Sequence, residues 1–362
     1  MIIFMQPEAL PKEIEVIENY LKELDCHFFT IKNAQKILLS VTGSQTHGAV
    51  STLKLLPGVA KVVPVTSPYK LASKEVQKEK SIIDLGDDLT IGGQDIIVMA
   101  GPCAVENEKT LFTVAEKVAA AGAKVLRGGA FKPRTSPYSF QGLEEEGLKL
   151  LAAARERTGL KIVTEVVNPQ DVELVAAYAD ILQIGARNMH NYPLLQKIGK
   201  QGRPILLKRG LSATVKEWLM AAEYILSGGN FNVILCERGI RTFEDYTRNT
   251  LDISAVPLIH DLSHLPIVVD PSHGSGNSKL VPALSRAAIA SGADGLLIEV
   301  HPQPQNAYCD GDQSLTPQDF HLLMESLPGL ARACGRNIGE PQTDLRNRVK
   351  HNTTNYAGVS TL

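Results

Sequence analysis

The sequence predicts an α/β protein, a TIM (β/α)8 barrel preceded by a small α+β ferredoxin-like domain. The barrel is predicted because eight short apolar segments recur from residue 96 onward, separated by stretches with helical spacing of apolar residues. Near-continuous apolar strands that alternate with helices are typical of a parallel sheet covered on both faces, and eight repeats over about 240 residues match a TIM barrel. An open doubly wound sheet remains an alternative, because periodicity does not show closure.

The first 70 residues have a different pattern, in which strands and helices follow the order βαββαβ. We expect strands at 2–4, 27–31, 36–41 and 59–65, and helices at 14–24 and 47–56. This order is that of a ferredoxin-like module.

The chain between the two parts is rich in charge over 67–84, which predicts a solvated linker. A hairpin is expected next, with 89–91 and 96–98 flanking two glycines. The polar, aperiodic end predicts a poorly ordered tail. The predicted organisation is a ferredoxin-like domain over 1–70, a linker and hairpin over 71–95, a TIM barrel over 96–336 and a tail over 337–362.

Within the barrel, each repeat supplies one expected strand. The strands are 96–99, 124–126, 161–163, 181–184, 205–207, 233–235, 267–269 and 296–298. Expected helices between them include 111–121, 143–157, 172–178, 215–226 and 280–291. TIM barrels carry their chemistry at the carboxyl ends of the strands, so the residues just after each segment are the candidates for a site.

Composition excludes several classes of function. The net charge of the 362 residues is −2, so there is no chain-wide positive excess with which to bind a nucleic acid. No apolar run is long enough to span a bilayer, and the first residues lack a basic leader, so we expect no membrane partner. The five cysteines are widely spaced and form no CxxC pair, which favours a reducing compartment. We therefore expect a cytoplasmic protein.

A polar or metal-binding side chain follows every one of the eight segments. In chain order these are Cys103, Arg127, Glu165, Arg187, Lys208, Arg238, Asp270 with His273, and Glu299. With Lys132 and Arg134 from the second loop, the cations number six. Cations gathered at one rim repel one another, which implies an anionic ligand such as a phosphate or carboxylate. A single cation at a strand end is more often a surface charge, and Glu165 could simply orient one of them; the shared position favours a binding site.

A second group is Cys103, His273, Glu299 and Asp310. Its thiol, imidazole and carboxylates suit a divalent transition metal, and the mixture does not choose among Mn, Fe, Co and Zn. A structural role for His273 is an equal alternative. His301 is a competing ligand, ranked lower because it lies further from the rim, and Cys309 is interpreted as a bystander rather than a redox-sensitive thiol.

Six segments together resemble one enzyme family. They are AGPC at 100–103, RGGAFKPRTSP at 127–137, GAR at 185–187, LKRG at 207–210, DPSH at 270–273 and DG at 310–311. Here the chain closely resembles the type I 3-deoxy-D-arabino-heptulosonate 7-phosphate (DAHP) synthases, in the subgroup with an N-terminal ferredoxin-like regulatory domain.

The resemblance implies a metal-dependent transferase that condenses phosphoenolpyruvate with erythrose 4-phosphate and water to DAHP and phosphate. This reaction is the first step of the shikimate pathway to the aromatic amino acids. The resemblance also implies a homotetramer and a front domain that binds Phe or Tyr, although an oligomerisation module without a ligand is an alternative for that domain.

Residue by residue, the resemblance implies a role for each motif position. It assigns Cys103, His273, Glu299 and Asp310 to the metal, and Arg127, Lys132, Ala186, Arg187, Lys208 and Arg238 to phosphoenolpyruvate. Arg134 and Thr135 are assigned to erythrose 4-phosphate. Lys132, Glu165 and His273 are the catalytic candidates for activating water, and the sequence does not rank them.

Two other functions compete with this one. The first is a 3-deoxy-D-manno-octulosonate 8-phosphate synthase, which uses arabinose 5-phosphate. Its loop at this place resembles Lys-Ala-Asn-Arg, whereas this chain has Lys132, Pro133, Arg134 and Thr135. A non-catalytic sensor with a relic barrel would be favoured by a missing metal ligand or a broken set of cations, and the sequence has neither defect.

Overall fold

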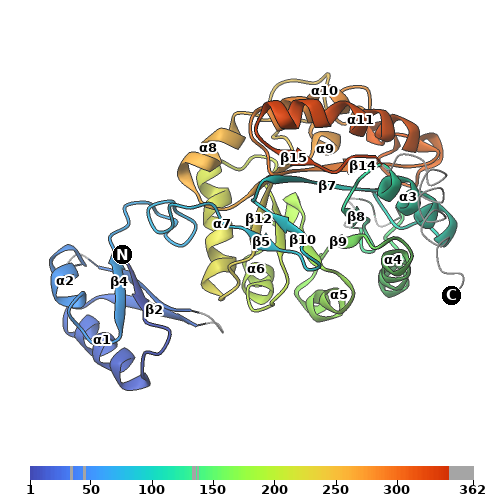
Figure 1. The fold of residues 1–362 in the computed structure, drawn as a ribbon. Coiled ribbons are helices and arrows are strands. Elements are labelled where there is room, and N and C mark those ends of the chain that lie inside the picture. Colours follow the sequence, from blue (N-terminus) through green and yellow to red (C-terminus); the bar gives the residue numbers. More distant parts are fainter. Residues whose placement is uncertain (33–35, 44–45, 133–135, 137, 342–362) are drawn as a thin grey trace, which may run out of the picture.

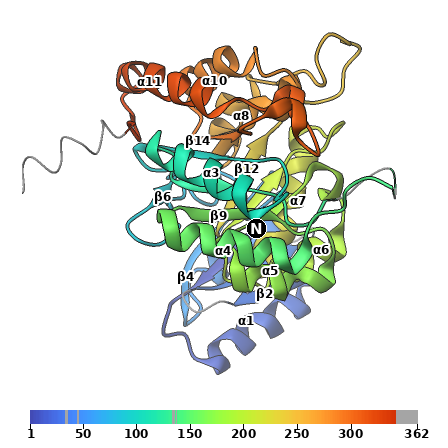
Figure 2. The same cartoon turned by 90° about the vertical axis from the view of Figure 1, so that its right-hand side faces the viewer.

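The computed structural model describes residues 1–32, 36–43, 46–132, 136 and 138–341. These residues form a small antiparallel domain and a parallel barrel wrapped by helices (Figures 1 and 2). In the part of the chain described, no helix is both long and apolar enough to cross a membrane.

The barrel consists of eight parallel strands, each hydrogen-bonded to the next in chain order. They are β7 (Asp95–Gly101), β8 (Val125–Arg127), β9 (Lys161–Glu165), β10 (Ile181–Ile184), β11 (Ile205–Lys208), β12 (Val233–Glu237), β13 (Ile267–Val269) and β14 (Gly295–Glu299). Strand β14 pairs in parallel with β7, from Gly295 opposite Ile97 to Glu299 opposite Gly101. The predicted closed barrel is therefore confirmed, and the open sheet is excluded.

Helices cover the outside of the barrel. They are α3 (Glu108–Ala120), α4 (Glu144–Thr158), α5 (Val172–Tyr178), α6 (Tyr192–Ile198), α7 (Val215–Ser227), α8 (Ala255–Leu262), α10 (Val281–Ala290) and α11 (Pro317–Ala333), with the short α9 (Pro271–Ser275) after β13. Local sequence sets several starts: the side chains of Asn107, Thr214 and Thr316 accept hydrogen bonds from the first turns of α3, α7 and α11.

The front domain is a four-stranded antiparallel sheet with two helices. Its strands β1 (Ile2–Met5), β2 (His27–Lys32), β3 (Ile37–Thr42) and β4 (Val59–Val63) lie in the order β2-β3-β1-β4. Helices α1 (Pro11–Glu23) and α2 (Thr46–Leu53) belong to the same domain, and Ile17, Leu21 and Leu53 form part of its core with buried residues of the sheet. The predicted βαββαβ order is confirmed.

The expected hairpin is wrong in its pairing. Strand β6 (Thr90–Ile91) pairs with β5 (Ile83–Asp84), because residues 96–98 belong to the barrel strand β7. Side chains of this hairpin, Ile83 and Ile91 among them, pack with buried barrel residues, and Asp87 pairs at 2.7 Å with Lys161, the first residue of β9. The hairpin therefore covers the end of the barrel opposite the strand ends that carry the candidate site.

The linker is not freely solvated over its whole length. Tyr69, Leu71, Ala72 and Val76 are buried in the same core as the barrel, because apolar residues alternate there with the charges. The carboxylate of Glu223 in α7 accepts hydrogen bonds from the backbone N–H groups of Leu71 (2.8 Å) and Ala72 (3.0 Å). The solvated interpretation is therefore wrong for this stretch.

The end of the chain begins with a short strand. Residues Asn337 and Ile338 form β15, which pairs in parallel with Asp95 and Ile96 at the start of β7. The expectation of a poorly ordered tail otherwise falls on 342–362, outside the described residues.

His264 attaches the linker to the barrel through both nitrogens of its ring. Its Nε2 lies 2.8 Å from the Leu71 carbonyl oxygen and its Nδ1 lies 2.8 Å from the Ser81 hydroxyl, and burial lowers the pKa of the ring. An unfolded chain therefore binds a proton below its ordinary pKa of 6.5 that the folded chain does not bind, so stability falls as pH drops below that value. We expect a lower urea midpoint at pH 5.5 than at pH 7.5, and a flatter dependence in His264→Gln; equal slopes would contradict this role.

Candidate active site

A cavity of about 240 Å³ lies at the carboxyl ends of the barrel strands. Its lining includes nine of the residues singled out in the sequence: Arg127, Lys132, Glu165, Ala186, Arg187, Lys208, Arg238, His273 and Asp310. Cys103 and Glu299 do not line the cavity themselves but contact residues that do. Arg134 and Thr135 lie outside the described residues. The structure therefore brings together the predicted residues that it describes.

Two glycines of the motifs are required by close approaches. A Cβ atom on Gly101 would lie 2.0 Å from the carbonyl oxygen of Arg127, so only glycine lets β7 turn toward Cys103 beside β8. A Cβ atom on Gly185 would lie 2.0 Å from Oε1 of Glu165. Glycine there leaves room for a carboxylate at the wall of the cavity.

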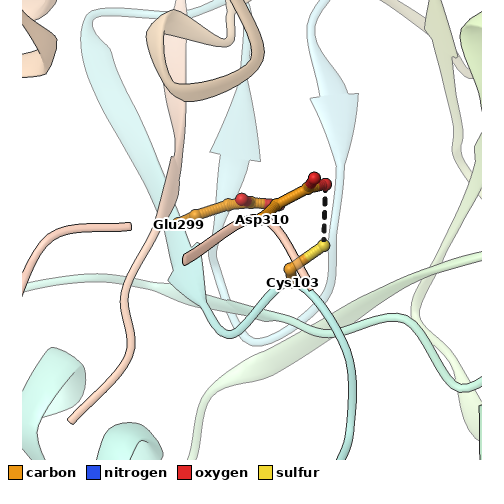
Figure 3. Close-up of side chains that lie close together, drawn as sticks. All are labelled: Cys103, Glu299 and Asp310. Atoms are coloured by element: carbon orange, nitrogen blue, oxygen red, sulfur yellow. Dashed lines mark hydrogen bonds between the residues drawn. The ribbon is translucent and has the colours of Figure 1, made fainter. Parts of the chain in front are cut away.

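Cys103, Glu299 and Asp310 form a cluster that could hold a metal ion (Figure 3). One ligand atom from each lies within 4.8 Å of the others. The Cys103 thiol donates a hydrogen bond to Oδ2 of Asp310 at 3.3 Å. The hydrogen bond with Cys309, burial and the charge on Glu299 all raise the pKa of Cys103 and outweigh the opposing charge of Lys132, so the sulfur holds its proton in the absence of a metal ion. A soft sulfur donor beside two carboxylates fits a divalent transition metal, which would take the place of that proton.

His273 lies next to this cluster. Its Nε2 is 3.4 Å from Oε1 of Glu299, and its Nδ1 is 2.7 Å from Oδ2 of Asp270. Asp270 also accepts a hydrogen bond from Lys208 Nζ at 2.7 Å and one from the backbone N–H of His273 at 2.9 Å. Asp270 therefore lies on the Nδ1 side of the imidazole while Nε2 faces the cluster, an arrangement similar to the carboxylate–histidine pairs of metal sites.

The cations of the cavity are partly neutralised by buried carboxylates. Arg127 forms an ion pair with Glu299, and Lys208 forms one with Asp270. For Arg238 the effect of burial dominates over that of the nearby carboxylates, and burial lowers the pKa of its guanidinium. An anion bound beside Arg238 would stabilise that charge, which is the behaviour expected of a phosphate or carboxylate site.

Sequence reasoning missed five residues that line the cavity, one of which is Leu211 in the loop after β11. Arg241, Arg248 and Asn249 line the cavity from the long loop after β12, several residues beyond the strand end. Gln183 lines it from within β10, and its Nε2 donates to Oε2 of Glu165 at 3.3 Å. Inspection of strand ends does not find these positions; the density of charge in RTFEDYTRN at 241–249 was the signal available for the loop.

The structure separates His301 from the cluster. Its Nε2 lies 3.2 Å from Oε2 of Glu106, and its Nδ1 accepts a hydrogen bond from the N–H of Gln303 at 3.1 Å. Glu106 also accepts a hydrogen bond from the N–H of Tyr308 at 2.7 Å. Both ring nitrogens are occupied, so His301 supports the loop that carries Asp310 instead of serving as a ligand.

Comparison with protein families agrees with this site. The model of the DAHP synthetase I family matches residues 74–332, which include the whole barrel. The chain belongs to this family. A model of the DAHP synthase ferredoxin-like domain matches residues 1–67. The DAHP synthetase I family model therefore covers the cavity and its metal cluster, and the second model covers the front domain.

Individual relatives agree with the family. A phospho-2-dehydro-3-deoxyheptonate aldolase of Thermotoga maritima is 48% identical over 93% of this chain and 100% of its own. A crystal structure of the Thermotoga maritima phospho-2-dehydro-3-deoxyheptonate aldolase (DAHP synthase) matches with a TM-score of 0.75 and 46% identity, over 93% of this chain and 99% of that one. A 2-dehydro-3-deoxyphosphooctonate aldolase of Desulfatibacillum aliphaticivorans is 31% identical over 69% of this chain and 97% of its own.

Proposed function

We propose that this chain is a DAHP synthase, which condenses phosphoenolpyruvate with erythrose 4-phosphate and water to DAHP and phosphate at the start of the shikimate pathway. The observation that carries this function is one cavity in which strand-end cations surround a Cys-Glu-Asp cluster. The Thermotoga relative that is 48% identical over its whole length supports it.

The cations have substrate-binding roles in this proposal. Phosphoenolpyruvate is held by the group that the resemblance assigns to it, namely Arg127, Lys132, Ala186, Arg187, Lys208 and Arg238. Its carboxylate and phosphate suit guanidinium and ammonium donors. Arg134 and Thr135 are proposed to bind erythrose 4-phosphate.

In the reaction, C3 of phosphoenolpyruvate forms a bond to the aldehyde carbon, water adds at C2, and the C2–O bond to phosphate then breaks. A divalent metal (Mn, Fe, Co or Zn) held by Cys103, His273, Glu299 and Asp310 would supply a Lewis acid for the aldehyde oxygen. Lys132 Nζ donates hydrogen bonds to the sulfur and to the backbone carbonyl oxygen of Cys103, both at 3.1 Å, an arrangement that suits its ammonium form.

Two of the three catalytic candidates, Lys132 and Glu165, are given different roles in proton transfer, and the third, His273, is kept as a metal ligand. Lys132, as an ammonium, can donate the proton that the aldehyde oxygen takes up. His273 faces Asp270 with one nitrogen and Glu299 with the other. Glu165 is a carboxylate at the cavity wall, and we propose it as the group that takes the proton of the attacking water.

A phosphate-release assay tests the proposed reaction. The full-length chain is given phosphoenolpyruvate with erythrose 4-phosphate or with arabinose 5-phosphate, with and without EDTA. We expect kcat/KM at least about tenfold higher with erythrose 4-phosphate, and loss of activity in EDTA that an added divalent metal restores. Preference for arabinose 5-phosphate would favour the reaction of the octulosonate relative, and no release with either aldose would favour the sensor.

For the front domain, we propose regulation by Phe or Tyr within a homotetramer. The match of residues 1–67 to the ferredoxin-like domain model supports a regulatory role. The contacts of Glu223 with Leu71 and Ala72 give a physical link from the linker to the barrel. Assays with each amino acid, beside the molar mass from light scattering, test both parts; an enzyme insensitive to Phe and Tyr would favour an oligomerisation module.

A further inference from the structure

A glutamine outside the proposed ligand set touches one of its members. Gln313 ends the short 3-10 helix η4 (Gly311–Gln313) and is 2% exposed. Its Nε2 donates a hydrogen bond to Oε2 of Glu299 at 2.7 Å, and its Oε1 accepts one from Arg248 Nη1 at 2.7 Å. Because a carboxylate lies on one side and a guanidinium on the other, a single orientation of the amide satisfies both.

We propose that Gln313 is a positioning residue that holds the carboxylate of Glu299 in place for the metal. This inference rests on the metal site of the proposed function. The other oxygen of Glu299 contacts Arg127 and lies 3.4 Å from His273 Nε2, so Gln313 supplies the remaining support. The carboxylate is 1% exposed, so bulk water does not reach it to replace a lost donor.

The backbone keeps Gln313 opposite Glu299. The N–H of Leu315 donates to the carbonyl oxygen of Glu299 at 2.9 Å, and Val300 and Leu315 form a parallel bridge. A Cβ atom on Gly311 would lie 2.1 Å from the carbonyl oxygen of Pro304, so the turn that delivers Gln313 requires glycine at its start. The loop is thus built to return beside the end of β14.

A neutral amide suits this position. A carboxylate in its place would repel Glu299, and an ammonium would compete with the metal for the same oxygens. Arg248 also lies 3.2 Å from Oδ1 of Asp310, so Gln313 and Arg248 connect the two carboxylates of the cluster. Partners of this kind, which hydrogen-bond to metal ligands, typically change metal affinity about 10- to 100-fold when removed.

Cobalt binding to the full-length chain tests the inference. The metal-free protein is titrated with Co²⁺ against a competing chelator, and the thiolate-to-cobalt absorption reports on the cluster. Gln313→Met keeps the length of the side chain but cannot donate, and we expect its Kd for Co²⁺ to rise about 10- to 100-fold, with an altered spectrum. Gln305→Met makes the same change at an exposed position of the same loop and should bind as the unmodified chain does.

The outcomes separate this inference from the proposed function. If the unmodified chain binds Co²⁺ without a thiolate band, the metal assignment itself fails. If it shows the band and Gln313→Met has a Kd within twofold of it, the role of Gln313 is overturned. Should Gln313→Met not fold, Gln313→Asn replaces it: its amide is one methylene too short to reach both partners, and a Kd less than about fivefold weaker would overturn the role.

Discussion

Replacing Cys103 with alanine is expected to remove the metal and to lower kcat/KM by at least about a thousandfold. Cys103 is the proposed sulfur ligand, and its sulfur lies within 4.8 Å of a carboxylate oxygen of Glu299 and of Asp310. A Lewis acid contributes several kcal/mol to such a reaction, and about 4 kcal/mol corresponds to a thousandfold in rate. Metal analysis of the purified variant, together with phosphate release at saturating added metal, measures both effects.

Cys309 offers a matched control for this substitution. It is a buried thiol that forms a hydrogen bond with Cys103, so Cys309→Ala makes the same chemical change one contact away. If Cys309 is a bystander, its variant keeps its metal and loses no more than a few-fold in rate. A metal-free Cys103→Ala with full activity would contradict the ligand assignment.

The second large effect is expected for Asp270→Asn. Asp270 is completely buried and accepts from Lys208, whose side chain is 5% exposed. Burial alone would raise the pKa of Asp270, but the charges of His273 and Lys208 outweigh it and hold this pKa well below the usual range. Removing the charge leaves the buried ammonium of Lys208 without a counter-charge, which lowers the free energy of unfolding by about 3–5 kcal/mol. Urea unfolding at pH 7.5 measures the loss.

The control for Asp270 is Asp252→Asn. Asp252 also pairs with a buried cation, Arg209, but Arg209 keeps a second partner in Glu237 at 2.8 Å. Asp252 is also 24% exposed, so water replaces part of what is lost. We expect a cost below about 1 kcal/mol there. Equal losses in the two variants would show that the pair of Asp270 with Lys208 has no special weight.

The fold could be predicted from sequence because its signals are local. Strands such as Ile267–Val269 are buried on both faces and are therefore continuously apolar, and the repetition of such segments determines the architecture. The prediction of the hairpin was wrong because the apolar sequence of residues 96–98 is the same whether these residues pair with β6 or begin a barrel strand. The prediction of a solvated linker was wrong because the high density of charge there outweighed the few apolar residues Leu71, Ala72 and Val76, which are buried.

The sequence could predict only those residues of the site that lie at or just after the end of a strand, because their place in the chain already indicates a functional role. Arg127, Glu299 and their neighbours lie at strand ends, where the fold places chemistry. Gln313 and Arg248 lie in long loops, and their roles depend on where those loops return. Asp270 was visible at its strand end, but its contacts with Lys208 and His273 required the folded barrel.

The pairing of β14 with β7 has a consequence for how the site is assembled. Cys103 and Asp310 are 207 residues apart and meet only across this seam between the first and last strands. An ion bound to both would cross-link the chain over nearly the length of the barrel, where the entropy of closing the loop is large. The proposed ligand set is therefore complete only when the barrel is closed, and a bound metal would add its free energy to the closed state. Chelation should accordingly speed global unfolding as well as stop catalysis.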